Sequence, residues 1–181
     1  MNLVDKAGQF IALKHDGQYR RGFDFPYSTH LFGVARVLKN AKYPEQVVVA
    51  GLLHDILEDS DTTEQELLEN FGLYILELVK AVSDPDKSIP WKERKQYVIA
   101  RIPQLTDEQM AITLAEKIQN LNSMTYVIST MGEEAWYGKS ANKEEQRWFY
   151  EQYFEATKKY HSQTKLLGEF EECLEKLFSL I

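Results

Sequence analysis

Apolar residues recur along much of this chain at the spacing that defines one face of an α-helix. The first such face predicts a helix near residues 3–16, which Gly17 ends. A second face predicts a helix that Ser28 or Thr29 caps and that carries apolar residues through Leu38. The sequence contains neither a sustained alternation of apolar and polar residues nor an Asn-Gly or Asp-Gly hairpin signal. The pattern therefore favours an all-α fold.

Prolines and capping signals predict where further helices begin. Pro44 suits the first turn of a third helix that runs through residue 59, and Pro90 and Pro103 bracket a short helix. Capping boxes predict further helix starts at Thr63 with Glu66, Thr106 with Gln109, and Asn142 with Glu145. The chain has no repeat, no Gly/Ser linker and no apolar run near the ~20 residues of a membrane span. Residues 1–181 are predicted to form a single compact multi-helix domain.

The net charge of −7 disfavours a protein that binds nucleic acid or anionic membranes through bulk charge. The charge is unevenly distributed, because residues 1–40 carry +3 and residues 41–80 carry −7. A solvated helical face is the usual explanation for such an acidic run. Cys173 is the single cysteine and cannot form an internal disulfide, so we expect a reducing, cytoplasmic setting.

The strongest chemical signal lies in the acidic segment. Residues 47–53 are apolar on every side of the predicted helix, and His54, Asp55, Glu58 and Asp59 follow at once. Carboxylates crowded at the end of a buried helix repel one another and lose hydration unless a cation compensates them. The alternative is a solvated helix end with a hydrogen-bonded His54–Asp55 pair.

Two other segments add polar residues to apolar faces. His30 lies among Leu31 and Phe32, where a core or capping role is the alternative, and Glu116 lies one turn before Asn120. The mixed nitrogen and oxygen set consists of His30, His54, Asp55 and Glu116. With no thiolate, this set suits an octahedral divalent ion, most of all Mn²⁺, with Fe²⁺, Mg²⁺ or Zn²⁺ less favoured. Such an ion lowers the pKa of bound water.

Four motifs resemble one family, the HD-type metal-dependent phosphohydrolases. The motifs are YRRGFDFPYSTH, GLLHDILEDSDTT, DKSIPWKERK and LAEKIQNL. They are most similar to the hydrolase domains of RelA/SpoT proteins and their small stand-alone relatives of the metazoan SpoT homologue type. The order and spacing agree from about residue 5 to residue 130. The resemblance implies an all-α HD-domain fold and phosphoester hydrolysis.

The resemblance also implies roles for individual residues. The metal ligands would be His30, His54, Asp55 and Glu116. The catalytic residues would be Glu58, Asp59 and Asn120. The substrate-binding residues would be Arg20, Arg21, Lys87, Ser123 and Tyr153. For Arg20 and Arg21 the alternative is a solvated loop, and for Tyr153 it is core packing.

The resulting hypothesis is a metal-dependent hydrolase that removes the 3′-pyrophosphate of guanosine tetra- and pentaphosphate. One alternative is a phosphohydrolase for another phosphorylated nucleotide, such as NADPH. The other is a nucleotide-binding regulatory module with degraded catalysis, because Glu116 stands where the family usually has Asp and Asn122 where it often has Arg. Gln119 is a further departure, at a position where the family has an aromatic residue or His. The expected partner is a small nucleotide, not nucleic acid or a membrane, and homo-oligomer formation stays open.

Overall fold

The computed structural model describes residues 2–20, 25–136 and 141–181. The α-helices of these ranges are α1 (Leu3–Lys14), α2 (Ser28–Asn40), α3 (Glu45–Leu52), α4 (Ile56–Asp59), α5 (Glu64–Phe71), α6 (Leu73–Val82), α7 (Trp91–Arg101), α8 (Asp107–Met131), α9 (Lys143–Tyr160) and α10 (Leu167–Phe178). Extended pairing in them is limited to an isolated bridge between Tyr19 and Pro26. The all-α prediction is confirmed. No helix of the described ranges is long and apolar enough to cross a membrane.

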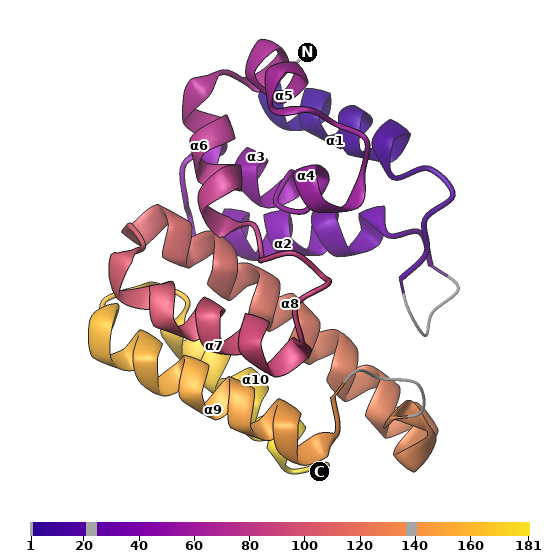
Figure 1. The fold of residues 1–181 in the computed structure, drawn as a ribbon, viewed down its shortest axis with the longest axis vertical. Helices are drawn as coiled ribbons and strands as arrows, with labels where there is room; N and C mark the ends of the chain where they lie inside the picture. The colour runs from indigo at the N-terminus through magenta and orange to yellow at the C-terminus, as the bar shows by residue number, and fades with distance from the viewer. Residues whose placement is uncertain (1, 21–24, 137–140) are drawn as a thin grey trace.

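The helices form two groups that meet along α8 (Figure 1). Helices α1 to α6 make the upper group of that view, and α7, α9 and α10 lie around α8 in the lower group. Helix α8 also contacts α2, α3 and α6. Its residues from Met110 to Ala115 are all buried, so α8 closes the core between the groups. This packing brings segments about 90 residues apart in sequence to one place.

Helix α3 is the most deeply buried part of the upper group. Every residue from Val47 to Leu53 is buried, as the all-round apolar pattern predicts. Gly51 lets α3 approach α2 closely, because a Cβ at this position would lie 2.3 Å from Cδ1 of Leu38. A larger residue would force Leu38 to move or push the two helices apart. At the first turn of α2, the ring of His30 lies 5.3 Å from the ring of His54, which follows α3.

The third helix does not run unbroken through residue 59 as predicted. Helix α3 ends at Leu52, residues 53–55 form a turn, and α4 begins at Ile56. In a continuous helix the carbonyl of Gly51 would accept a bond from the N–H of Asp55. Here the ring nitrogen Nδ1 of His54 donates to that carbonyl at 2.8 Å instead. His54 and Asp55 therefore lie on a turn, and the prediction of one helix through residue 59 is wrong.

The capping signals gave most other helix starts correctly. Reciprocal capping boxes form at Thr106 with Gln109 and at Asn142 with Glu145. At Thr63 the hydroxyl accepts from the N–H of Glu66, which is half of the predicted box. Gly72 ends α5 at a positive φ of 83°, and α6 begins directly after it without a capping signal. Helix α6 is therefore an element that the sequence pattern did not predict.

The start of α2 differs from the prediction. Neither Ser28 nor Thr29 caps the helix, which begins at Ser28 after Tyr27. The hydroxyl of Thr29 donates instead to the carbonyl of Pro26 at 2.8 Å. Tyr27 is thus left at the helix start with its ring directed to the end of α3, where its hydroxyl reaches Asp55. The start of α2 therefore has no side-chain cap, and Tyr27 contacts Asp55 instead.

Candidate active site

Two histidines and an aspartate meet where α2 abuts the turn after α3. His30 comes from the first turn of α2, and His54 and Asp55 come from the turn itself. Each offers one ligand atom, and the three atoms lie within 4.8 Å of one another. His30 and His54 are buried, and Asp55 is partly buried. Below, these three residues are called the metal-site group.

The hydrogen bonds of the metal-site group fix how its members point. Because Nδ1 of His54 donates to the carbonyl of Gly51, its Nε2 carries the lone pair in the neutral ring. That Nε2 lies 3.0 Å from Oδ2 of Asp55, and Nε2 of His30 lies 3.9 Å from the same oxygen. The hydroxyl of Tyr27 donates to this Oδ2 at 2.5 Å. A backbone carbonyl and a phenol thus hold two of the three candidate ligands from behind.

The charges inside the metal-site group are strongly coupled. Burial alone would lower the pKa of His54, but the carboxylates of Asp55 and Glu116 outweigh burial and raise it to about 9. Burial would raise the pKa of Asp55, yet the neighbouring His54 holds it well below its usual range. Burial, together with the charge of His54, lowers the pKa of His30. The group therefore stabilises a positive charge beside Asp55.

The donor atoms fit a divalent cation. Nε2 of His54 and Nδ1 of His30 are both buried, and neither has a hydrogen-bond partner in the described part of the chain. The short approach of Nε2 of His54 to Asp55 lacks hydrogen-bond geometry, so nitrogen and carboxylate both face one space. A buried, unpaired polar atom is costly unless something binds it. Two imidazoles and a carboxylate are a ligand set that divalent first-row metals accept.

Glu116 lies near this group but outside it. Its Oε1 accepts a hydrogen bond of 2.6 Å from the amide of Asn120, and its Oε2 pairs with Nζ of Lys117. The amide oxygen of Asn120 in turn accepts from Nη2 of Arg20 at 2.5 Å. Among the described residues the metal-site group has three members, so the role of Glu116 as fourth ligand stays a prediction. Arg20, Asn120 and Glu116 form one connected chain beside it.

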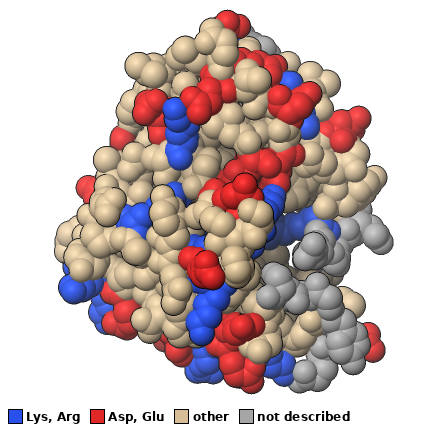
Figure 2. Space-filling model, viewed as in Figure 1, with Lys and Arg blue, Asp and Glu red and all other residues tan. Residues whose placement is uncertain are grey.

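Glu58 and Asp59 lie on α4, directly after the metal-site group, and are called the carboxylate pair below. Oε1 of Glu58 accepts a 2.8 Å hydrogen bond from the backbone N–H of Asp84. Burial, followed by the charge of Asp55, raises the pKa of Glu58 to about 7. The carboxylate of Asp59 pairs with Nζ of Lys87. Figure 2 shows acidic and basic side chains side by side near the middle of this face.

A pocket of about 460 Å³ adjoins the metal-site group at His30. Arg20 lines it near the site, and Gln119, Asn122 and Ser123 line it along α8. The hydroxyl of Ser123 donates to the backbone carbonyl of Gln119 at 2.9 Å. The volume is of the size that small-molecule sites have. The predicted residues Arg20 and Ser123 therefore line one cavity, together with the metal-site residue His30.

Of the remaining predicted substrate-binding residues, Tyr153 lies in the core. Tyr153 has no exposed surface, and its hydroxyl donates to Thr113 at 2.9 Å. Its ring packs 5.8 Å from the ring of Phe170. A side chain without exposed surface cannot touch a substrate, so the prediction for Tyr153 is corrected to core packing. Arg21 lies outside the described residues.

The structure adds residues that the sequence did not assign to the site. Tyr27 stands within the motif YRRGFDFPYSTH, three residues before His30, so its position was visible in the sequence but its contact with Asp55 was not. Asp84 acts through its backbone N–H, which carries no residue-specific signal. Lys117 follows Glu116 and is 3% exposed. These three residues are identified only by their contacts in the folded chain, between segments far apart in sequence or in the buried core.

Comparison with known proteins gives one family model and a set of relatives. The model described as HD domain matches residues 7–135. The human protein named guanosine-3′,5′-bis(diphosphate) 3′-pyrophosphohydrolase MESH1 is 38% identical over 122 residues, covering 66% of this chain and 68% of the human protein. The zebrafish (Danio rerio) protein of the same name is 36% identical over 118 residues, covering 64% of this chain and 65% of its own length.

Two solved structures resemble the fold. The crystal structure of lmo0812 from Listeria monocytogenes EGD-e aligns with a TM-score of 0.74 and 29% identity, covering 83% of this chain and 99% of that chain. A structure described as a metazoan ortholog of SpoT that hydrolyzes ppGpp aligns with a TM-score of 0.78 and 24% identity. It covers 100% of this chain and 98% of that chain. At that identity the second likeness supports the fold alone.

Proposed function

The chain belongs to the HD-domain family, and from this premise we propose that it hydrolyses the 3′-pyrophosphate of guanosine tetra- and pentaphosphate in a metal-dependent reaction. The observation that carries the proposal is the metal-site group lying directly before the carboxylate pair and beside a nucleotide-sized pocket. The names of the MESH1 relatives, which are up to 38% identical, describe the same reaction. The partner is thus a small phosphorylated nucleotide.

His30, His54 and Asp55 would hold the ion, with Glu116 as the proposed fourth ligand. The mixed nitrogen and oxygen donors favour Mn²⁺ over the softer metals. A bound divalent ion supplies a nucleophile at neutral pH and polarises a phosphoryl oxygen. Tyr27 and the carbonyl of Gly51 orient Asp55 and His54 for this task.

The carboxylate pair would manage the protons of the reaction. Oε1 of Glu58 is occupied by the N–H of Asp84, and Oε2 makes no hydrogen bond within the described residues, so Oε2 can hold a proton. Asp59 lies next to it on the same turn, paired with Lys87. Together they would take a proton from the water that attacks the 3′-phosphorus and pass one to the ribose 3′-oxygen, which leaves as the bond to the released pyrophosphate breaks.

The cations around the pair would bind the phosphate groups. Arg20 donates to the amide oxygen of Asn120 and also lines the pocket. Its planar guanidinium group is suited to binding a phosphate. Lys87 is 60% exposed and can turn from Asp59 to a substrate oxygen. We propose the same role for Arg21, and contact with the nucleoside for Ser123. The single thiol of Cys173 supports a reducing, cytoplasmic setting.

The test is a metal-dependent release assay. The protein is stripped with a chelator, reloaded with Mn²⁺, and given guanosine tetraphosphate, with GDP as the substrate that lacks the 3′ group and NADPH as the competing nucleotide. We expect pyrophosphate only from guanosine tetraphosphate, and only with metal. Phosphate from NADPH at a higher kcat/KM would reassign the substrate. If the wild type bound nucleotide tightly but released no product, and Glu58→Gln bound it equally well, the protein would be a binding module rather than an enzyme.

A further inference from the structure

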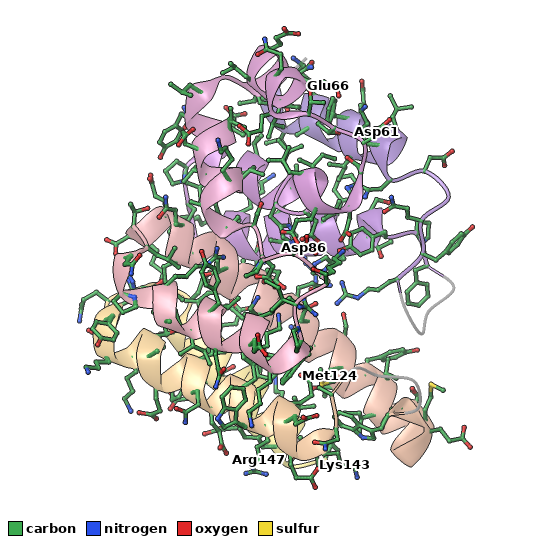
Figure 3. All side chains as sticks on the ribbon, viewed as in Figure 1. Asp61, Glu66, Asp86, Met124, Lys143 and Arg147 are labelled. Carbon is green, nitrogen blue, oxygen red and sulfur yellow. The ribbon has the colours of Figure 1, made fainter. Side chains whose placement is uncertain are left out.

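The loop between α6 and α7, residues 83–90, contacts both members of the carboxylate pair. Its Asp84 donates the backbone N–H to Oε1 of Glu58, and its Lys87 pairs with Asp59. In Figure 3 the labelled Asp86 of this loop lies at the boundary between the two groups of helices. The position of the pair therefore depends on a segment that begins 24 residues after Asp59 in the chain.

Two cations of α7 fasten the start of this loop. Nζ of Lys95 lies 3.1 Å from Oδ2 of Asp84. The guanidinium of Arg101 donates to the carbonyls of Ser83 and Val82, both at 2.8 Å. The side chains of Lys95 and Asp84 are only 15% and 23% exposed, so solvent screens their attraction weakly. Asp84 is thus held from its carboxylate on one side while its N–H faces Glu58 on the other.

This ion pair is an expensive way to gain stability. Burial lowers the pKa of Lys95, and the positive charge of Lys117 lowers it further, so the cation has a real desolvation cost. A buried ion pair contributes little net stability compared with apolar residues of the same volume, whereas breaking one leaves an uncompensated charge. The ring of Phe149 lies 5.1 Å from Nζ of Lys95, and this cation–π contact offsets only part of the cost. Positioning of Asp84, whose N–H binds Glu58, is the better explanation for the Lys95–Asp84 pair.

We propose that Lys95 is a positioning residue for catalysis, which holds Glu58 in place through the carboxylate and backbone N–H of Asp84. The proposal rests on the proposed function, since it assigns Glu58 its working position. Lys95 itself touches neither the metal-site group nor the pocket-lining residues in the described part of the chain. Its effect should therefore appear in the rate of the chemical step rather than in substrate affinity.

The first experiment compares kcat and KM for pyrophosphate release in three variants. In Lys95→Met, which keeps the length of the side chain but removes its charge, kcat should fall ~10- to 100-fold, the scale of a small misplacement of a catalytic group. KM should stay within about twofold, since the pocket is untouched. Lys95→Arg should recover most of kcat. The control Lys92→Met, on the same helix but over the ring of Trp148, should match the wild type.

The second experiment tests the coupling without relying on turnover. Lys95→Met and Asp84→Asn each break the pair, so the double variant should lose no more kcat than the larger single loss. Amide exchange at Asp84 should become faster in Lys95→Met and stay protected in Lys92→Met, at equal global stability in urea.

The outcomes separate the two proposals. Normal kcat in Lys95→Met with a protected Asp84 amide would overturn the positioning role and leave the proposed function intact. A wild type that releases no pyrophosphate would sink the proposed function alone, because amide exchange still reports whether Lys95 holds Asp84. If Lys95→Met does not fold, Asp84→Asn provides the same rate and exchange readouts, and a normal kcat with a protected Asp84 amide in that variant would overturn the positioning role.

Discussion

The carboxylate pair follows His54 and Asp55 of the metal-site group within five residues in the chain, but the two sets of side chains are held in different ways. His54 and Asp55 are fixed from inside the upper group of helices, by the carbonyl of Gly51 and the hydroxyl of Tyr27. The carboxylate pair takes its contacts from the loop after α6, which α7 of the lower group anchors. Metal binding should therefore tolerate changes at the junction of the groups, and proton transfer should not.

Replacing a predicted metal ligand should have the largest effect on both metal binding and turnover. In His54→Gln, we expect loss of bound metal and a fall in kcat. The fall should exceed the ~10- to 100-fold loss that is usual when a residue supporting a metal ligand is replaced. Metal content of the purified protein, measured beside pyrophosphate release, checks the prediction. Asp61→Asn is the control, because Asp61 is a nearby acid that is 86% exposed. Full metal content in His54→Gln would contradict the assignment.

Substitution in the carboxylate pair should separate chemistry from metal binding. In Glu58→Gln we expect kcat to fall ~10²- to 10⁴-fold, the usual contribution of a general acid or base, with the metal content unchanged. The same measurements apply, and Glu66→Gln on the neighbouring helix is the matched control. If Glu58→Gln also lost its bound metal, the metal-site group and the carboxylate pair would depend on each other, and the expected separation of metal binding from proton transfer would be wrong.

A milder change probes the support of the metal-site group. Tyr27→Phe removes the hydroxyl that donates to Oδ2 of Asp55 and leaves the ring in place. Metal affinity should weaken ~10- to 100-fold, while kcat at saturating metal changes less. Titration with Mn²⁺ measures the affinity, and Tyr97→Phe at an exposed position is the control. Equal affinity in both variants would mean that Asp55 needs no such support.

The smallest effect concerns stability at the junction, where Asp84 faces Lys95 and Arg101 of α7, Lys117 of α8 and Glu58 of α4. Burial would raise the pKa of Asp84, but the charges of Lys117 and Lys95 outweigh burial and lower it. A lowered folded-state pKa means stability that is present above the unfolded pKa of about 3.9 and lost as pH falls through the folded value.

The measurement for Asp84 is urea unfolding of Asp84→Asn and the wild type. At pH 7 the variant should be less stable by about 1–3 kcal/mol, because a buried cation loses its partner. Below about pH 4 the gap should narrow, since wild-type Asp84 then takes up a proton as well. Asp86→Asn in the same loop serves as the control. A gap that is constant with pH would show that charge is not its cause.

Helix type and much of the site were predictable because they depend on local pattern. The capping boxes at Thr106 and Asn142 are set by residues three apart. The buried run before His54 follows from its composition. What failed locally was the single helix through residue 59, since the ring of His54 competes for the carbonyl of Gly51. A side chain that replaces a backbone donor leaves the apolar pattern unchanged, so the pattern could not reveal it.

The sequence by itself determined an all-α chain, the residue types of a divalent-metal site, and an acidic segment that contains them. Only the tertiary structure decided which of those residues meet. It placed His30 against His54, joined Arg20 to Asn120, and buried Tyr153 in the core. Periodicity specifies which face of a helix is apolar, whereas packing between helices far apart in the chain determines which polar side chains share one space.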